Sequence, residues 1–440
     1  MADYLQNPIA SMLLETNVVV IGAGVAGLAS ARLLGRRGVR CLVLEAGDRI
    51  GGRIRSERRD GWQLPIELGA EFVHGHPAPT LARGGPTFRL VRVPEHRVLA
   101  STPPRPMHDT WQQFARIMQA AGNGEPGGSV LEYLDRHDAS LADRALATLI
   151  VEGYHAAPLH DISARSIADD ASTIERKHEQ YRPAQGYEGL VNTLKQDLID
   201  FGCRALLQTQ VKRINWASGL VEVHATCPGA DLVVQAHCCV TTISVGVLRS
   251  APAEGGIEFR PSPASLEQAL PGLAMGQVLR MVLRFERAPW LSAVGGAAVE
   301  FLHAPDAPFD TFWRQASGGQ EQVTAWAGGP KAGELSRLDE ADLVLAALRS
   351  LAMATHHDLA SCQAALIEAH CHDFNRDPLT RGAYSYVRPG GEQAPGILAT
   401  PCEGTLFFAG EALDRQFPGT VAGALGSGEH AAREVLASWS

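Results

Sequence analysis

The sequence predicts an α/β protein whose first domain binds a dinucleotide, and three features near the N-terminus support this prediction. The apolar run at 18–21 is short and β-branched, as in a strand buried on both faces of a parallel sheet. Directly after it comes the G-x-G-x-x-G spacing, formed by Gly22, Gly24 and Gly27. A second apolar strand, at 41–44, ends where such a unit needs a carboxylate for the ribose hydroxyls, at Glu45.

The spacing of these glycines has a physical reason. The first lets the chain turn tightly, the second lets the backbone approach a pyrophosphate, and the third lets the next helix sit against the strand. That helix is predicted from about Val25 to Arg37, with Ala26 on its apolar face and Gly38 as its stop. Because Glu45 would repel a 2′-phosphate, the pattern argues against NADP.

Composition and charge narrow the range of partners. A chain of 440 residues is long enough for two or three domains. The formal net charge is −9 and no Lys/Arg block exceeds two or three residues, so neither nucleic acid nor an anionic membrane surface is expected as a main partner. No apolar stretch approaches the roughly 18 residues of a membrane span, and residues 1–15 lack the pattern of a secretory signal. We therefore expect a soluble, cytoplasmic protein.

The cysteines and histidines show no metal-binding pattern. Neither C-x-x-C nor H-E-x-x-H occurs among the eight cysteines and sixteen histidines, so no metal is predicted. Most cysteines have apolar neighbours in the sequence and are predicted to be small core residues. The adjacent pair Cys238 and Cys239 could be redox-active, but the interior of a strand is the preferred interpretation.

The rest of the chain divides into a helical part and a strand-rich part. Residues 76–110 are rich in Pro, Arg and Gly and predict an irregular connection. Helical patterns follow from Thr110 to about Asp200, with breaks at 122–128 and 158–163. Strands are predicted at 204–208, 211–215, 220–225 and 231–240. Beyond Pro261 the pattern suggests a mixed sheet, with strands at 276–285, 297–302, 309–315 and 322–327 and helices at 339–354 and 358–366.

Motifs at opposite ends of the chain resemble the signatures of one family. They are EAGDRIGGR at 45–53, FFAGE at 407–411 and FPGTVAGA at 417–424. All three are similar to motifs of the flavin-containing amine oxidases, the group of monoamine oxidases, polyamine oxidases and flavin histone demethylases. The form FPGTVAGA looks closer to the polyamine oxidase and demethylase branch. The resemblance continues in the expected order through 67–75, 241–248 and 377–386, and is weakest over 76–185.

The resemblance implies two domains, each assembled from separated segments. One is a glutathione-reductase-like, Rossmann-type FAD-binding domain, formed by 1–75, 186–260 and 395–440. The other is an α+β substrate-binding domain, formed by 76–185 and 261–394. The FAD is expected to be non-covalent, because Ala383 aligns with the cysteine that links the flavin in monoamine oxidases.

The resemblance also implies which residues contact FAD. Glu411 would approach the pyrophosphate and ribitol, and Val211 would meet the adenine through its backbone. The backbone N–H groups of Thr420 and Val421, with the helix dipole, would stabilise negative charge on the reduced flavin. The full expected set is Gly22, Gly24, Ala26, Gly27, Glu45, Ala46, Arg49, Gly52, Arg53, Gly69, Ala70, Glu71, Phe72, Val211, Gly410, Glu411, Thr420, Val421 and Ala424.

The implied reaction oxidises a C–N bond of an amine or polyamine to an imine by hydride transfer to the flavin, with O2 reduced to H2O2. Arg280 stands where the family has a lysine that assists the reaction with oxygen. Arginine cannot readily lose its charge, so either oxygen use is altered or Arg280 turns away and a neighbour substitutes. His74 stands where some polyamine oxidases place a group that meets the substrate ammonium, and the alternative is a histidine bonded to nearby backbone.

Aromatic side chains are expected to form the substrate pocket, since their faces exclude water and attract a cationic amine. Tyr384 and Phe417 belong to blocks that line the pocket in the family, and with Arg280 and His74 they complete the predicted catalytic set. Trp313, Phe374 and Tyr386 could line the pocket or simply fill the core. Phe374 also replaces a tryptophan of the family, so an indole N–H donor is missing there.

Other functions share this fold and stay open. An L-amino acid oxidase usually carries an arginine where Glu71, Phe72 and Val73 follow the Gly-Ala of this chain. Arg280 in place of the family lysine keeps open a second alternative, a desaturase or porphyrinogen oxidase that acts on an apolar carbon skeleton. A non-catalytic FAD-binding partner protein is the third alternative. For the main prediction the partners are a small amine and O2, and the protein is expected to be a monomer or a homodimer.

Overall fold

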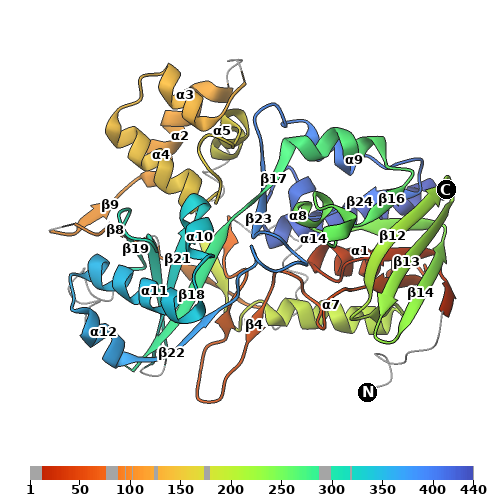
Figure 1. Ribbon diagram of the computed structural model, residues 1–440, viewed down its shortest axis with the longest axis horizontal. Coiled ribbons are helices and arrows are strands. Elements are labelled where there is room, and N and C mark those ends of the chain that lie inside the picture. The colour runs from red at the N-terminus through yellow and green to blue at the C-terminus, as the bar shows by residue number, and fades with distance from the viewer. Residues whose placement is uncertain are drawn as a thin grey trace.

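The computed structural model describes residues 12–75, 88–94, 96–101, 103–122, 127–172, 179–286, 299–317 and 320–439. These residues form three parts, which Figure 1 shows: a parallel sheet with its covering layers, a seven-stranded sheet, and a group of short helices that stands apart. None of the described helices is long and apolar enough to cross a membrane.

The parallel sheet is the part that the first motif predicts. Its strands lie in the order β11 (Arg204–Leu206), β3 (Cys41–Leu44), β2 (Val18–Ile21), β15 (Cys238–Thr241) and β24 (Leu406–Phe408). One face packs against the helices α1 (Val25–Arg36), α7 (Glu188–Asp200) and α14 (Val421–Ser438). The strands predicted at 18–21 and 41–44 are therefore confirmed, and α1 ends one residue before the predicted end.

A second sheet covers the other face of the parallel sheet, because alternate residues of its strands are apolar and pack inward. Its strands lie in the order β1 (Met12–Glu15), β14 (Ala230–Ala236), β13 (Leu220–Cys227), β12 (Gln210–Ala217) and β16 (Glu258–Arg260). The prediction of a single strand at 231–240 was wrong. It is two strands, since the chain crosses at the exposed His237 from the alternating pattern of β14 to the continuously apolar β15.

The seven-stranded mixed sheet has the predicted character. Its order is β22 (Leu366–Cys371), β18 (Val278–Phe285), β21 (Gln320–Gly328), β20 (Thr311–Ser317), β19 (Phe301–His303), β8 (Arg97–Leu99) and β9 (Arg105–Met107). Its core also contains the helices α10 (Gly329–Leu335), α11 (Glu340–Thr355) and α12 (Leu359–Ala365). Residues 76–110 were predicted to be irregular, but β8 and β9 form the edge of this sheet, where a proline such as Pro106 is tolerated.

The helical part has a core of its own. It contains α2 (Thr110–Met118), the 3₁₀ turn η2 (Gln119–Gly122), α3 (Val130–Arg136), α4 (Leu141–Gly153) and α5 (Ala164–Ser172). The break predicted at 158–163 lies between α4 and α5, and most of the break predicted at 122–128 lies outside the described residues. A third break was missed: Ser140 caps α4 by accepting a hydrogen bond from the Asp143 N–H, so the chain stops and restarts there.

Short elements connect these parts. Strand β10 (Gln180–Pro183), inside a region predicted as helical, pairs with β6 (Val73–His74) and β7 (Leu90–Val93). The others are β4 (Ser56–Glu57), β5 (Ile66–Glu67), β17 (Leu273–Gly276), β23 (Tyr384–Val387), α8 (Val245–Leu248), α9 (Ala264–Ala269), α13 (Ala394–Ala399), η3 (Pro252–Glu254), η4 (Leu270–Gly272) and η7 (Glu411–Leu413). The exact domain boundaries given above stay a prediction.

Candidate active site

A cavity of about 860 Å³ is shared by all three parts of the fold. It is lined by Gly22 and Glu45 beside the parallel sheet, by Trp313 on the seven-stranded sheet and by Tyr154 at the end of α4. Of the site residues predicted from the sequence, every one except Gly27 lines this cavity. Segments from both ends of the chain therefore meet at one place.

The glycines of the first motif have the three roles that their spacing predicts. Gly22 has a φ of +99°, which a side chain would strain. At Gly24 a Cβ atom would meet nothing closer than the Gly52 Cα at 3.9 Å, so this position is open toward the cavity. At Gly27 a Cβ atom would lie 1.9 Å from the Gly22 oxygen. Gly27 therefore serves the contact between helix and strand, which explains why it does not line the cavity.

Glu45 is held in place by backbone groups at the end of β3. Its Oε2 accepts a hydrogen bond of 2.7 Å from the Ala23 N–H, and its Oε1 accepts one of 2.7 Å from the Gly47 N–H. Each carboxylate oxygen keeps a further lone pair for a hydroxyl. The carboxylate is thus pre-oriented at the cavity wall, as recognition of a ribose requires.

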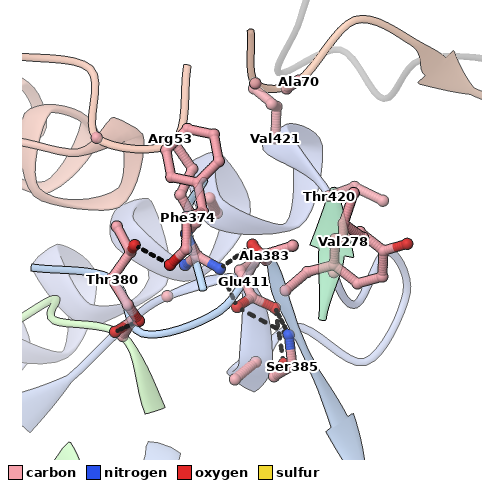
Figure 2. Close-up of a pocket in the computed structure, with 18 of the residues that line it drawn as sticks. Arg53, Ala70, Val278, Phe374, Thr380, Ala383, Ser385, Glu411, Thr420 and Val421 are labelled. Atoms are coloured by element: carbon pink, nitrogen blue, oxygen red, sulfur yellow. Dashed lines mark hydrogen bonds and ion pairs between the residues drawn. The ribbon is translucent and has the colours of Figure 1, made fainter. Parts of the chain in front are cut away.

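Arg53 and Glu411 join the two end motifs, as Figure 2 shows. Arg53 Nη1 donates 2.7 Å to Glu411 Oε1 and 2.8 Å to the Ala383 carbonyl. Glu411 Oε2 accepts a hydrogen bond of 2.7 Å from the Ser385 hydroxyl. Because Glu411 is buried and paired, this link fixes the loop of the first motif against the segment that follows β24 of the parallel sheet.

The N-terminus of α14 also faces the cavity. Thr420 is its N-cap: Oγ1 accepts from the Gly423 N–H at 3.0 Å and donates to the Phe417 carbonyl at 2.8 Å. Thr420, Val421 and Ala424 line the cavity. The positive end of the helix dipole therefore lies at the wall and favours a negative charge there.

Arg280 is buried beneath the cavity wall in an ion pair with Glu71. Its Nη1 also donates 2.8 Å to the Gly69 carbonyl, and its Cζ lies 5.5 Å from the centre of the Trp313 ring. Its Nε finds no hydrogen-bond partner among the described protein atoms. Arg280 thus does not turn away from the cavity, and no lysine among the described residues lines the cavity in its place.

Glu71 is the centre of this buried network. Besides Arg280, its carboxylate accepts from Arg182 Nε at 2.6 Å, from Trp313 Nε1 at 2.9 Å and from Gln315 Nε2 at 2.8 Å. Burial by itself would raise the pKa of Glu71, but the attraction of Arg280 and Arg182 brings the pKa below its usual value. The carboxylate is therefore ionised and committed to protein partners.

The sequence predictions missed several of the aromatic side chains that line the cavity, Tyr154 and Trp111 among them. Tyr154 stacks edge to face with His74 at 5.3 Å and with Trp111 at 4.9 Å, and its carbonyl accepts a hydrogen bond of 2.6 Å from the Tyr384 hydroxyl. Burial raises the pKa of both tyrosines, so they stay neutral phenols. No signal in the sequence singles out these two residues: Trp111 packs against the core that contains Phe114 and Tyr133, and Tyr154 directly follows α4.

The weaker aromatic candidates also line the cavity. Trp313, Phe374 and Tyr386 are all in its wall, together with Trp326, whose ring centre lies 5.6 Å from that of Trp313. Figure 2 shows Phe374 among the residues that line this cavity. The sequence left open whether Trp313 and Phe374 are pocket or core residues. They are both at once, because each side chain is buried and also borders the cavity.

One end of the cavity, lined by Gly22, Gly24 and Glu45, suits a dinucleotide, and the other end is lined by aromatic side chains such as Tyr154 and Tyr384. Together the dinucleotide end and the aromatic end define a nucleotide-dependent oxidoreductase. Comparison with known proteins gives the family. The family model for flavin-containing amine oxidoreductases matches residues 25–436, so the chain belongs to that family. This confirms the family suggested by the end motifs.

Relatives and solved structures agree with this membership. The chain is 27% identical over 457 residues to lysine-specific histone demethylase 1 homolog 2 of Arabidopsis thaliana, covering 96% of this chain and 58% of that protein. It is 28% identical over 523 residues to polyamine oxidase 1 of Oryza sativa subsp. japonica, covering 96% and 97%. The chain thus spans little more than half the length of its demethylase relatives.

Two solved structures share the fold. Wild-type putrescine oxidase bound to putrescine superposes with a TM-score of 0.79 at 18% identity, covering 97% of this chain and 100% of that one. Cyclohexylamine oxidase from Brevibacterium oxydans IH-35A superposes with a TM-score of 0.79 at 19% identity, covering 96% and 99%. The predicted α/β fold class is confirmed.

FAD is the cofactor of this family, and the cavity fits it. Gly24 leaves open space at the cavity, Glu45 presents its carboxylate to it, and the N-terminus of α14 offers positive potential at the far end. Ala383 lines the cavity, and no cysteine is found among the described residues that do so.

Proposed function

We propose that this protein oxidises a C–N bond of an amine or polyamine to an imine and passes the electrons through FAD to O2, forming H2O2. The observation that carries the proposal is the continuity of the cavity: residues for a dinucleotide and an aromatic wall line the same space. FAD held by the residues around Gly24, Glu45 and the N-terminus of α14 would supply the hydride-accepting and oxygen-reducing chemistry. The protein supplies binding, orientation and charge.

The aromatic wall would bring the amine in and keep water out. Tyr384, Phe417, Tyr154 and Trp111 present ring surfaces to the cavity, which attract an approaching ammonium ion and displace water from around the reacting carbon. Tyr384 is held by its hydrogen bond to the Tyr154 carbonyl, so these two residues move as a unit. A ring nitrogen of His74, beside Tyr154, would accept a hydrogen bond from the amine.

Arg280 would act as a permanent cation at the reacting end. Because a guanidinium does not lose its proton, Arg280 can stabilise negative charge but cannot serve as a proton donor. Glu71 and the Gly69 carbonyl fix its position. We therefore assign the side chain of Glu71 to the positioning of Arg280 rather than to FAD. We assign the other predicted cofactor residues to FAD because they line the same cavity, with the exception of Gly27, which supports the packing of α1.

Anaerobic reduction of the flavin tests the proposal. Candidate primary amines, secondary amines, diamines and polyamines are added to the oxygen-free holoprotein, and bleaching of the flavin absorbance is followed. Admission of oxygen should restore the absorbance and release one H2O2 for each imine formed. Failure of every amine to bleach the flavin would contradict the proposal. Photochemical reduction of the same sample serves as the control, since it shows that the flavin can be reduced.

An amino acid oxidase is the second candidate, and Arg97 favours it. This side chain lines the cavity and lies over Phe301, with its Cζ 4.3 Å from the ring centre, so it could meet a substrate carboxylate. Its neighbour His303 is uncharged, because burial lowers the pKa of His303 to about 3. Bleaching by free amino acids but not by the matching decarboxylated amines would select this function.

We also propose a cytoplasmic location and a monomeric or homodimeric state. All eight cysteines are free thiols, which is typical of a reducing compartment. Cell fractionation tests the first proposal. Light scattering of the purified holoprotein tests the second.

A further inference from the structure

Two buried cysteines, far apart in sequence, lie side by side beneath helix α1. Cys41 begins β3 and Cys203 directly precedes β11, and the two strands are parallel neighbours. Arg204 is opposite Leu42 in their register, so Cys203 is opposite Cys41 one step earlier. Both side chains belong to the same core, on the α1 face of the sheet, where the Cys41 thiol donates 3.5 Å to the Val39 carbonyl and the Cys203 thiol donates 3.4 Å to the Ala31 carbonyl of α1.

The geometry suits a covalent bond between them. Neighbouring strands lie roughly 4.8 Å apart, and a disulfide needs Cα atoms about 4.4–6.8 Å apart with their side chains on one side. Cys41 and Cys203 meet both conditions, and both are reduced in this structure. They lie just inside the surface, since Arg40, Gly202 and Arg204 beside them in the chain are exposed.

The two neighbouring thiols are chemically unequal. The interaction with Cys41 lowers the pKa of Cys203. The interaction with Cys203, together with burial, raises the pKa of Cys41. Cys203 therefore loses its proton more readily and is the nucleophile of the pair, and Cys41 is the thiol that resolves the product.

We propose that Cys41 and Cys203 form a reversible disulfide when the protein meets a hydroperoxide. The Cys203 thiolate attacks one oxygen of H2O2, the O–O bond breaks, and a sulfenic acid and hydroxide result. The Cys41 sulfur then attacks the sulfenic sulfur, the S–S bond forms and hydroxide leaves. The two thiols lose two electrons and two protons, and the peroxide becomes two waters.

Cys238 provides a matched control within the same sheet. Val18 is opposite Cys41 on one side and opposite Cys238 on the other, so one strand separates these two thiols. Their separation of about 10 Å, two strand spacings, exceeds the roughly 7 Å limit for a disulfide. Cys238 and Cys239 face opposite sides of the sheet, which confirms the strand interior and excludes a bond between these neighbours.

The disulfide would strengthen the cofactor site. Glu45 directly follows β3, and its backbone N–H donates 2.8 Å to the carbonyl of Leu206 at the end of β11. A bond at the start of these two strands would hold together the pair whose far ends carry the ribose carboxylate. We therefore expect the oxidised protein to melt at a higher temperature and to lose FAD more slowly.

Peptide mapping of the peroxide-treated holoprotein tests this proposal. After H2O2 treatment, free thiols are blocked, the protein is digested without reductant, and linked peptides are identified by mass spectrometry. We expect a Cys41–Cys203 peptide that disappears with dithiothreitol. It should be absent from Cys41→Ser and Cys203→Ser and present in Cys238→Ser. The melting temperature should rise on oxidation only where the linked peptide forms.

The opposite result is equally clear. If Cys41 and Cys203 keep their thiols while Cys238 is oxidised, or if no linked peptide forms although other residues are oxidised, the proposal is wrong. Mapping of the wild-type protein decides this even if a serine variant fails to fold. Because the peroxide is added, a protein without amine oxidase activity would still form the bond, so the two proposals fail separately.

Discussion

The two ends of the cavity are built in different ways. The dinucleotide end consists mainly of backbone groups, glycine spaces and one carboxylate, and most of it comes from a single stretch, 22–53. The reacting end consists of large side chains from segments far apart in the chain. There Arg280 on β18 meets Glu71 near the N-terminus, and Tyr384 on β23 meets Tyr154 after α4.

This difference decides how each end responds to mutation. At the dinucleotide end a glycine either leaves room for the cofactor or lets α1 pack against its strand. Substitution of the first kind should weaken cofactor binding, and substitution of the second kind should destabilise the fold. At the reacting end each charged or polar group has a distant partner, so a single change leaves another group unpaired. Four experiments with variants test the comparison, from the largest expected effect to the smallest.

Gly27→Ala and Gly24→Ala separate the two kinds of glycine. Gly27→Ala should unfold the dinucleotide unit, with a loss of several kcal/mol, on the order of 4, because its Cβ would lie 1.9 Å from the Gly22 oxygen. Gly24→Ala should fold normally, since the nearest atom is 3.9 Å away, but bind FAD at least about 10-fold more weakly because the methyl group occupies the path of the pyrophosphate. Thermal melting and FAD titration measure the two effects. Equal melting temperatures for both variants would contradict the assignment.

Glu71→Gln tests the buried network at the reacting end. The change leaves Arg280 and Arg182 without their common counter-charge, and the free energy of unfolding should fall by about 3–5 kcal/mol. Glu188→Gln is the matched control. It breaks an exposed pair with Arg58 and should cost less than about 1 kcal/mol. Urea unfolding gives both values, and similar values would mean that the network does not stabilise the fold.

Glu67→Gln tests a pH effect beside the same network. Burial raises the pKa of Glu67 from 4.5 to about 7, so between these values the folded state holds a proton that the unfolded state has released. The contribution of Glu67 to stability is thus fully present below pH 4.5 and is lost as the pH rises to 7, by about 3 kcal/mol. Unfolding measured from pH 4 to 8 should show this decline in the wild type and a flatter profile in the variant. If stability fell equally with pH in the wild type and in Glu67→Gln, the decline would not come from Glu67.

Tyr384→Phe should have the smallest effect. It removes the hydrogen bond to the Tyr154 carbonyl and should cost about 1 kcal/mol of stability. If these two residues form the amine pocket, KM for the amine should rise by less than about 10-fold. Tyr133→Phe, which removes a hydrogen bond to the Ile117 carbonyl at a residue that does not line the cavity, should have the same cost in stability without the change in KM. Equal KM values for the two variants would remove the Tyr154–Tyr384 pair from the substrate site.

The sequence predicted the dinucleotide end closely because its determinants are local. The strands at 18–21 and 41–44, the open space at Gly24 and the carboxylate of Glu45 all follow from short-range spacing, and each is found as predicted. The two strands within 231–240 were less visible. At a single residue, His237, the chain passes from the second sheet to the parallel sheet. The periodicity of apolar residues does not reveal such a crossing.

The reacting end needed the tertiary structure. From the sequence, Arg280 was a charged residue on an apolar strand and Glu71 a residue of a cofactor motif, and nothing in either segment indicated that they pair. Tyr154 and Trp111 lie in the stretch where the family resemblance is weakest, so no motif pointed to them. By itself, therefore, the sequence determined the family, the parallel sheet and the cofactor, because spacing along a strand and a helix encodes them. Only the fold decided which side chains face each other across the cavity, since burial and pairing depend on segments that meet only in space.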